Sequence, residues 1–416
     1  MSHMPRRLFK VAAMIVSALA AAGGSSAAAN LAAHAAATTT SPWGQTDYNA
    51  AQSRANLAET ILTRANVAQA VHLRAITIGL KPPSQACSQQ VDSLALPGGS
   101  VYVAGGGFVA KYGAATGHLL WRRSTSVSSQ DRLDSVAVGD VLVVVGGSDC
   151  GSASDPRGTM QAFNAMTGEL AWTRPVTASA GALDTLVVSS GLVISAGFSE
   201  GGGPQLSVRR IGTGALVWKS VSDASCSGRM LVVAQVVITG GDCNAGTQAI
   251  IGRRLASGAK VWQRAGVWQL QRGDASSLAG HHLFVTNPKG TIVSLNPLTG
   301  RTQFALSGAT AVLAVGSGQA YAVCGSSVCA YSKSDGSLRW KVSAGFTPAL
   351  AAEAGGVLYL DGGTALNTGN GKALATLWTG RSASSLAISD GRIAAVTGPP
   401  PFTRTKVIDL YGLKGS

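Results

Sequence analysis

Short apolar runs separated by turn residues recur along most of the chain. Examples are SVAVGDVLVVVGG at 135–147, TLVVSSGLVISAG at 185–197 and SLAGHHLFVTNPKGTIVSLN at 277–296. The runs are rich in Val, Leu and Ile and are bounded by Gly, Asn, Asp or Ser, and no window keeps the i, i+3, i+4 spacing of a core helix. The pattern therefore predicts an all-β chain built from short strands.

An eleven-residue pattern recurs among these runs and ends in an aromatic residue four positions after a turn glycine. Its six copies are KYGAATGHLLW (111–121), AFNAMTGELAW (162–172), VRRIGTGALVW (208–218), GRRLASGAKVW (252–262), SLNPLTGRTQF (294–304) and AYSKSDGSLRW (330–340). The spacing between successive glycines falls from 51 to 35 residues when a degenerate seventh copy at Gly371 is included. One period then holds four antiparallel strands, which is typical of a propeller blade.

This pattern resembles the tryptophan-docking motif of pyrroloquinoline quinone (PQQ) repeat propellers, whose idealised form is A-x-D-x-x-T-G-x-x-x-W. The copy at 162–172 matches the motif except that Asn164 stands in place of Asp. The resemblance covers roughly residues 69–413 and implies a β-propeller of the quinoprotein alcohol dehydrogenase-like superfamily. That superfamily contains both dehydrogenases and non-enzymatic propellers, and we assign this chain to the non-enzymatic branch.

The repeated aromatic residues are predicted to dock one blade onto the next. A flat ring on the outermost strand can cover the neighbouring sheet while an indole N–H finds a backbone carbonyl. Ligand stacking is the alternative role for these rings. The docking residues are Trp121, Trp172, Trp218, Trp262, Phe304 and Trp340.

The glycine register predicts seven blades, and the chain ends supply an eighth. Residues 385–398 and 405–413 provide three strands after Trp378. By analogy with the family, the segment VHLRAITIGL at 71–80 supplies the fourth strand and closes the ring. Closure removes the open sheet edges that would otherwise template aggregation. We therefore predict an eight-bladed propeller of four-stranded antiparallel blades.

The N-terminus carries the pattern of an export signal. Arg6, Arg7 and Lys10 precede an apolar stretch at 11–22, and small-residue cleavage sites follow. The stretch is shorter than the roughly 20 residues of a membrane span. We predict a signal peptide at 1–37, an extended linker at 38–68 and the propeller at 69–416, in a secreted or envelope-associated protein. Retention of the N-terminus as an anchor is the alternative.

All six cysteines lie in the predicted propeller, and an even number in an exported chain favours disulfides. Cys324 and Cys329 flank a short hairpin loop, which brings them within bridging range. Cys226 precedes one strand of the fourth blade and Cys243 follows the next, so their strand ends share a face. These pairings leave Cys87 with Cys150. A zinc or redox site would need CxxC spacing and nearby histidines.

The chain is basic, with a formal net charge of +14. Basic residues follow the docking aromatic in five copies, at Arg122, Arg123, Arg174, Lys219, Arg264 and Lys341. Such a band favours anionic surfaces or polymers, although it can also serve only to keep the protein soluble. We predict a monomer that binds an envelope protein or an anionic wall polymer, with no nucleic acid partner and no membrane span in the mature chain.

The catalytic parts of a quinoprotein dehydrogenase are missing from the sequence. The resemblance implies an adjacent Cys–Cys pair over the quinone, a tryptophan floor, calcium held by Glu, Asn and Asp, and an aspartate base. No two cysteines are adjacent, and the only glutamates are Glu59, Glu169, Glu200 and Glu353. The adjacent His281 and His282 would point to opposite faces of a strand. We predict no cofactor, no metal and no catalytic residue, with a degenerate oxidoreductase as the alternative.

Polar residues recur where the innermost strands are expected to begin. We expect these starts at 92–93, 134–135, 184–185, 276–277 and 384–385, so that they converge on the mouth of the central channel. Ligand binding there is one interpretation, and satisfaction of exposed strand ends is the other. The candidate residues of the channel mouth are Asp92, Arg132, Asp134, Asp184, Arg229, Arg272, Asp274 and Arg381.

Overall fold

The strands of this chain are held in successive hairpins. The computed structural model describes residues 43–79, 93–105, 107–125, 132–139, 141–148, 158–175, 182–199, 203–221, 230–240, 249–274, 281–397 and 405–415. Within these residues the secondary structure is almost entirely β, with a single 3-10 turn, η1 (Val67–Gln69). The prediction of an all-β fold is confirmed.

The first four blades each contain four antiparallel strands, named below in order from the innermost to the outermost. Blade 1 has β3 (Ser93–Ala95), β4 (Ser100–Gly105), β5 (Phe108–Gly113) and β6 (Leu119–Ser124). Blade 2 has β7 (Arg132–Val138), β8 (Leu142–Ser148), β9 (Gly158–Asn164) and β10 (Leu170–Pro175). Blade 3 has β11 (Ala182–Ser189), β12 (Leu192–Ser199), β13 (Gly203–Arg210) and β14 (Leu216–Val221). Blade 4 has β15 (Met230–Val233), β16 (Val236–Thr239), β17 (Ala249–Arg254) and β18 (Lys260–Ala265).

The other four blades follow the same order, except that the last one borrows its outer strand. Blade 5 has β19 (Gln269–Gly273), β20 (Leu283–Thr286), β21 (Ile292–Leu295) and β22 (Thr302–Ala305). Blade 6 has β23 (Ala311–Val315), β24 (Gln319–Cys324), β25 (Ser327–Ser332) and β26 (Leu338–Ser343). Blade 7 has β27 (Ala351–Ala354), β28 (Val357–Leu360), β29 (Thr364–Asn367) and β30 (Ala373–Thr376). Blade 8 has β31 (Ser385–Ser389), β32 (Arg392–Thr397), β33 (Thr405–Gly412) and β2 (Val71–Gly79).

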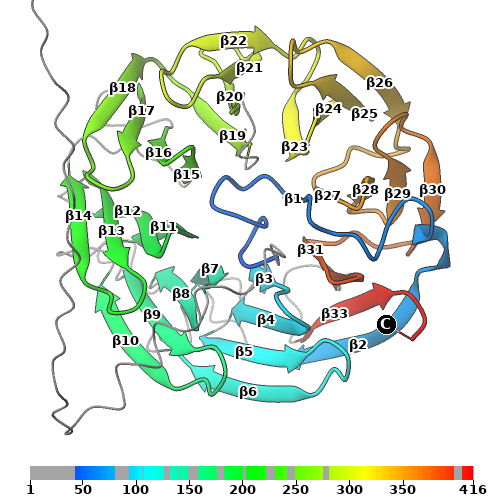
Figure 1. Cartoon of the computed structure of the whole chain (residues 1–416), viewed down its shortest axis with the longest axis horizontal. Coiled ribbons are helices and arrows are strands. Elements are labelled where there is room, and N and C mark those ends of the chain that lie inside the picture. Colours follow the sequence, from blue (N-terminus) through cyan, green and yellow to red (C-terminus); the bar gives the residue numbers. More distant parts are fainter. Residues whose placement is uncertain are drawn as a thin grey trace, which may run out of the picture. The chain divides into compact units, whose positions relative to one another are not determined.

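The blades form a closed ring around a central channel (Figure 1). Each innermost strand contacts the innermost strands of the blades before and after it, and β31 of blade 8 contacts β3 of blade 1. Closure depends on β2, which pairs antiparallel with β33 from Val71↔Gly412 to Gly79↔Thr405. The predictions of eight blades and of closure by an N-terminal strand are confirmed.

The repeated aromatic of one blade lies against the turn glycine of the next blade. A Cβ atom built on Gly168 would come within 2.8 Å of Trp121, and one on Gly258 within 2.8 Å of Trp218. The indole N–H also donates to a carbonyl three residues before that glycine, as from Trp121 to Ala165 O (3.3 Å). The same contact between a ring and a turn glycine pairs Trp172 with Gly214, Trp262 with Gly300, Phe304 with Gly336 and Trp340 with Gly371. The turn glycines are therefore needed both for their positive φ and for the flat surface they offer to a ring.

The junction between blades 8 and 1 does not use an aromatic. At this junction Arg74 of β2 approaches Gly117, and a Cβ atom on Gly117 would lie 3.1 Å from Arg74 Cδ. Trp378 of blade 7 also departs from the pattern, because its indole N–H donates to Asp361 O within the same blade (3.1 Å). The regular docking contact therefore fails where the N-terminal chain enters the ring.

One disulfide lies within the described residues. It joins Cys324 of β24 to Cys329 of β25 across a hairpin. Cys87, Cys150, Cys226 and Cys243 lie outside the described residues, so their predicted pairings remain predictions.

Candidate functional site

The central channel is occupied at one end by the protein's own N-terminal chain. We call residues 43–59 the strap. They follow the inside of the ring and leave it over blade 8, after which the chain continues through η1 to β2 (Figure 1). Trp43 is fully buried, and no side chain from Trp43 to Asn56 is exposed. The sequence predicts an extended linker at residues 38–68, and residues 43–59 of that segment lie inside the ring.

The strap hydrogen-bonds to blades 1 to 4 in chain order. Leu96 N–H after β3 donates to Trp43 O (2.7 Å), and Val138 N–H of β7 donates to Gly44 O (2.7 Å). The Gln45 amide forms two 2.9 Å hydrogen bonds with the backbone of Val188 in β11. Val232 N–H of β15 donates to Ala50 O (2.7 Å). The strap therefore uses backbone groups that the innermost strands leave unpaired on their channel side.

The same pattern continues around blades 5 to 8. Gly273 N–H donates to Ala51 O (2.8 Å), Val315 N–H to Ser53 O (2.8 Å) and Glu353 N–H to Arg54 O (2.8 Å). Residues 55–56 form β1 (Ala55–Asn56), a short parallel strand beside β27. In blade 8 the Asn56 amide donates to Ile388 O (2.9 Å), and Gly391 N–H donates to the Glu59 carboxylate (3.1 Å). The strap is thus bound to all eight blades.

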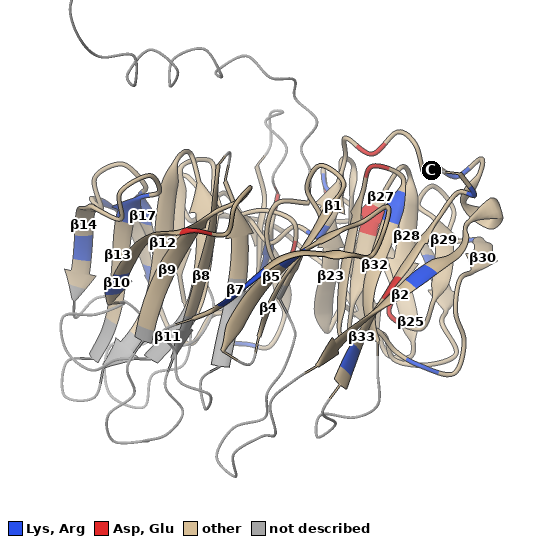
Figure 2. Ribbon diagram, turned by 90° about the horizontal axis from the view of Figure 1, so that it is seen from below, with Lys and Arg blue, Asp and Glu red and all other residues tan. Residues whose placement is uncertain are grey.

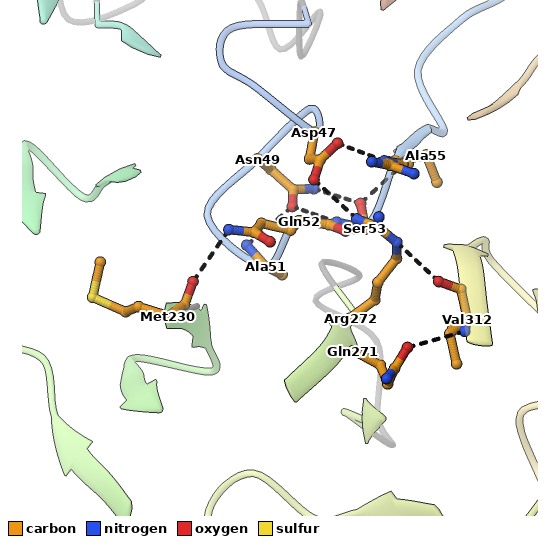
Figure 3. Close-up of polar contacts among 11 residues, drawn as sticks. Asp47, Asn49, Ala51, Gln52, Ser53, Ala55, Met230, Gln271, Arg272 and Val312 are labelled. Atoms are coloured by element: carbon orange, nitrogen blue, oxygen red, sulfur yellow. Dashed lines mark hydrogen bonds and ion pairs between the residues drawn. The ribbon is translucent and has the colours of Figure 1, made fainter. Parts of the chain in front are cut away.

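An ionic contact fixes the middle of the strap to blade 5 (Figure 3). Asp47 pairs with Arg54 of the strap and with Arg272 of β19, whose Nη1 lies 3.1 Å from Asp47 Oδ2. Arg272 Nη1 also donates to Gln52 O (2.7 Å), and its Nε donates to Val312 O (3.2 Å). Burial alone would raise the pKa of Asp47, but the two guanidinium groups outweigh it and hold that pKa well below its usual range.

The strap has a strained backbone. Asp47, Tyr48, Gln52 and Arg54 all have positive φ angles, between 50° and 81°. Non-glycine residues adopt this region at a cost of about 1–2 kcal/mol each. The strap therefore keeps this conformation only while its hydrogen bonds and the Asp47 ion pairs are present. We expect that loss of the ion pairs also weakens the hydrogen bonds.

A second buried ionic cluster joins blades 5, 6 and 7 beside the strap. Lys333 Nζ lies 2.7 Å from Asp274 Oδ2, and both side chains are buried. Glu353 of β27 is also buried, and its Oε2 has no hydrogen-bond partner. Burial raises the pKa of Glu353 to about 7, although a hydrogen bond from Tyr321 and the charge of Lys333 act in the opposite direction. Glu353 is therefore largely protonated in mildly acidic solution.

Two of the predicted channel-mouth residues, Arg272 and Asp274, lie at the strap end of the channel. Arg272 and Asp274 are buried, with internal partners, at the end of β19 rather than in a loop leading into a strand. The physical reason is that the innermost strand of blade 5 begins earlier in the sequence than expected. The innermost strand of blade 5 is Gln269–Gly273, which precedes the expected start at 276–277. Arg272 and Asp274 therefore belong to the strap end of the channel.

The remaining candidates lie elsewhere or outside the described part of the chain. Arg132, Asp134 and Asp184 fall at the beginnings of β7 and β11, although their side chains are not described. Arg381 precedes β31 and pairs with Asp409 (3.1 Å). Asp92 and Arg229 are outside the described residues. A ligand site at the strand-start end of the channel thus remains a hypothesis based on sequence.

Three arginines of the predicted basic rim have structural contacts. Arg123 Nε donates to Gly168 O (3.0 Å), Arg174 Nη2 to Thr213 O (2.9 Å) and Arg264 Nη1 to Gly300 O (3.1 Å). Each arginine follows the docking tryptophan by two positions and binds the turn of the next blade. This part of the rim therefore reinforces the contacts between blades.

The described residues do not fit the donor set of a quinone and its calcium ion. The carboxylate of Glu59 accepts from the backbone of Ile61, Leu62 and Gly391, so it is already engaged in holding the chain. The disulfide at Cys324 lies in the second and third strands of its blade, away from the innermost strand. No group of three or more potential metal ligands occurs among the residues whose positions are described.

Comparison with known proteins places the chain in a family. The model for PQQ-repeat propellers described as "Outer membrane protein assembly factor BamB" matches residues 27–306 and 250–410. The chain belongs to this family. No curated protein matches this BamB-like chain in a sequence comparison.

Solved structures share the fold of this BamB-like chain at low sequence identity. Quinohemoprotein alcohol dehydrogenase from Comamonas testosteroni is 13% identical, with a TM-score of 0.65 over 91% of this chain and 81% of the other. BamB from Moraxella catarrhalis is 17% identical, with a TM-score of 0.55 over 83% and 98%. A europium-containing methanol dehydrogenase is 12% identical, with a TM-score of 0.62 over 90% and 98%. Dehydrogenases and BamB thus share this architecture.

The strap had no clear signal in the sequence. Residues 43–59 read WGQTDYNAAQSRANLAE, a mostly polar stretch with small residues and without strand alternation. Such a composition is typical of a linker. Its hydrogen-bond partners are spread over all eight blades, so only the closed ring creates its binding site.

Proposed function

We propose that this protein is an exported, non-catalytic β-propeller that acts as a binding or scaffold module at the cell envelope. Its partner would be an envelope protein or an anionic wall polymer. The match to the BamB-like family supports a binding role, and the predicted signal peptide supports export. Within the described residues, no helix is long and apolar enough to cross a membrane.

One observation favours the binding role over a quinone enzyme. The strap binds all eight blades, so the chain itself lines one end of the channel. In addition, two pairs of charged residues there are bound to each other, Asp274 to Lys333 and Asp47 to Arg272. An oxidoreductase would need unpaired polar groups converging on a substrate.

The two roles can be separated with the purified exported form, residues 38–416. After incubation with PQQ and calcium followed by desalting, we expect no quinone absorbance and no dye-linked oxidation of alcohols or sugars. Stoichiometric retention of PQQ with turnover would establish the enzyme instead.

The binding role is tested by affinity capture from envelope extract with mass spectrometry of the captured material. Because Arg272 is buried, the variant that probes the strand-start end of the channel is Arg132→Ala with Arg229→Ala. We expect this double variant to capture less of the partner than the wild type while keeping its melting temperature. Unaltered capture would exclude this end of the channel as the binding surface.

A further inference from the structure

Among the residues that the structure describes, the exposed large apolar side chains lie on one face of the ring. We call this the turn face: it carries the turns between the first and second strands and between the third and fourth strands of each blade, and it includes the strap. The outermost strands begin there, and most of them place an exposed apolar residue near the start. These residues include Leu119, Leu170, Leu216, Val261 and Leu338, with exposed fractions between 42% and 55%.

Other parts of the turn face add to this set. Val141 and Met166 lie in turns of blade 2, and their exposed fractions are 62% and 81%. Leu57 and Ile61 are exposed where the strap leaves the channel, and Ile61 lies against Gly391 of the first turn of blade 8. Among the described residues, every exposed large apolar side chain lies on or at the edge of the turn face. The turn face therefore exposes large apolar residues from most of the blades.

The same face is positively charged. Exposed cationic side chains lie at the ends of third strands and at the starts of fourth strands. They are Arg210, Arg254, Lys260, Arg301 and Lys372. The exposed acidic residues that the structure describes there are Glu169 and Asp335. Apolar side chains interleaved with an excess of Lys and Arg are characteristic of surfaces that lie on anionic lipid.

The arrangement fits a membrane better than a protein partner. A protein hot spot is a compact cluster in a desolvated centre, whereas these residues are distributed singly around the ring, blade by blade. A fluid, planar surface can accept all of them at once. Figure 2 shows that the turn face forms one side of the ring, with β1 of the strap and the chain's C-terminus on this side.

The strap also begins on this face. The described chain begins at Trp43, which pairs with Leu96 beyond the turn-face end of β3. We propose that the turn face docks the propeller onto an anionic lipid bilayer, with the apolar residues of the outer strands inserted into the interface.

The proposal is tested with the exported form, residues 38–416, which contains the whole compact unit from Ser41 to Ser416. Its sedimentation with vesicles of phosphatidylglycerol and phosphatidylcholine is compared with that for phosphatidylcholine alone, at low and high salt. We expect binding to the anionic vesicles only, with a partition coefficient that falls as salt increases. Equal binding to both vesicles, or none to either, would overturn the proposal.

Two turn-face variants and a matched control locate the surface. Leu119→Ser/Leu170→Ser/Leu338→Ser and Arg210→Gln/Arg254→Gln/Lys372→Gln should each weaken partitioning by roughly tenfold or more. The control Lys219→Gln/Lys289→Gln/Lys341→Gln makes the same change of charge at exposed positions away from the turn face, and should retain most of the binding. Unchanged melting temperatures establish that all variants are folded. A control that loses as much binding as the turn-face variants would refute the assignment of this face.

Failure of this proposal is distinguishable from failure of the proposed function. Vesicle sedimentation reports lipid binding alone, whereas capture from envelope extract stripped of lipid reports a protein or polymer partner. A protein that captures a partner but ignores vesicles refutes only the lipid inference.

Discussion

Trp172 of blade 2 lies against Gly214 of blade 3 and donates its indole N–H to Ile211 O at 2.8 Å. Gly214 has a φ of +66°, and a Cβ atom there would come within 2.9 Å of the indole ring. The same pairing of a ring with the next blade's glycine occurs at five blade interfaces besides this one. Because the same contact recurs at each of these interfaces, neighbouring blades pack against each other in a similar way.

Gly214→Ala is expected to destabilise the protein more than Gly191→Ala. Both glycines have positive φ, at +66° and +72°, but no atom lies within 4 Å of a Cβ on Gly191. Gly191→Ala should cost about 1–2 kcal/mol through backbone strain, and Gly214→Ala an additional 1–3 kcal/mol or so through the clash with Trp172. Equilibrium unfolding in urea measures both, and equal losses would contradict the docking contact.

Replacement of the ring itself separates packing from hydrogen bonding. Trp172 is buried, so Trp172→Ala should lower the free energy of unfolding by roughly 3–5 kcal/mol. Trp172→Phe keeps an aromatic ring but leaves Ile211 O without its donor, and we expect a smaller loss. A loss below about 1 kcal/mol for Trp172→Ala would indicate that ligand stacking is the role of this tryptophan.

The Asp47–Arg272 pair is expected to control the strap. Arg272→Ala leaves Asp47 with one cationic partner in a buried setting and should cost roughly 3–5 kcal/mol. Backbone amides that donate to the strap, such as Val232 N–H and Gly273 N–H, should then exchange faster with solvent. Arg381→Ala is the control for the strap, because Arg381 pairs with Asp409 of blade 8 and not with a strap residue. Unchanged exchange at the strap would contradict the role of Arg272.

The low pKa of Asp47 predicts a loss of stability in acid. Its pKa in the folded protein is below the unfolded value of about 3.9, so its contribution is present above that value and is lost as the pH falls toward the folded pKa. Asp47→Asn should therefore lower stability near neutral pH and reduce the loss between about pH 4 and pH 2. Melting temperatures measured across this range provide the test, and parallel curves for both proteins would refute it.

The raised pKa of Glu353 makes its contribution to stability change with pH in the opposite direction. Its folded pKa of about 7 lies above its unfolded value, so the protonated form stabilises the protein at low pH. That contribution is lost as the pH rises from about 4.3 through 7. Glu353→Gln should remove this loss and make the variant relatively more stable at pH 8 than at pH 5, compared with the wild type. Tyr321→Phe is a companion variant, because it removes the hydrogen bond that opposes the raised pKa.

Closure by β2 predicts that the N-terminal strand cannot be removed. Deletion of residues 69–80 exposes the edge of β33, which pairs with β2 along its length. Open edges of this kind template aggregation, so we expect insoluble or oligomeric protein by size-exclusion chromatography. A soluble, monomeric deletion variant with an unaltered melting temperature would be incompatible with closure by this strand.

The sequence by itself determined the propeller. Each of the first six blades is a local unit whose apolar runs, turn glycine and terminal aromatic recur with a spacing of 35 to 51 residues, so propensity and pattern agree with the fold at short range. Closure by residues 71–80 could also be predicted, because a missing fourth strand implies an open edge that must be covered.

The tertiary structure alone decided the strap, the ionic contacts beneath it and the turn face. Arg272 appears in the sequence as one more polar residue near a strand, and it becomes a buried partner of Asp47 only after 225 residues of chain have brought the two together. The strap has no periodicity of its own, because its conformation is imposed by hydrogen-bond donors from all eight blades. Likewise, Leu119 and Leu338 are apolar residues of ordinary strands until ring closure places them on one side of the molecule.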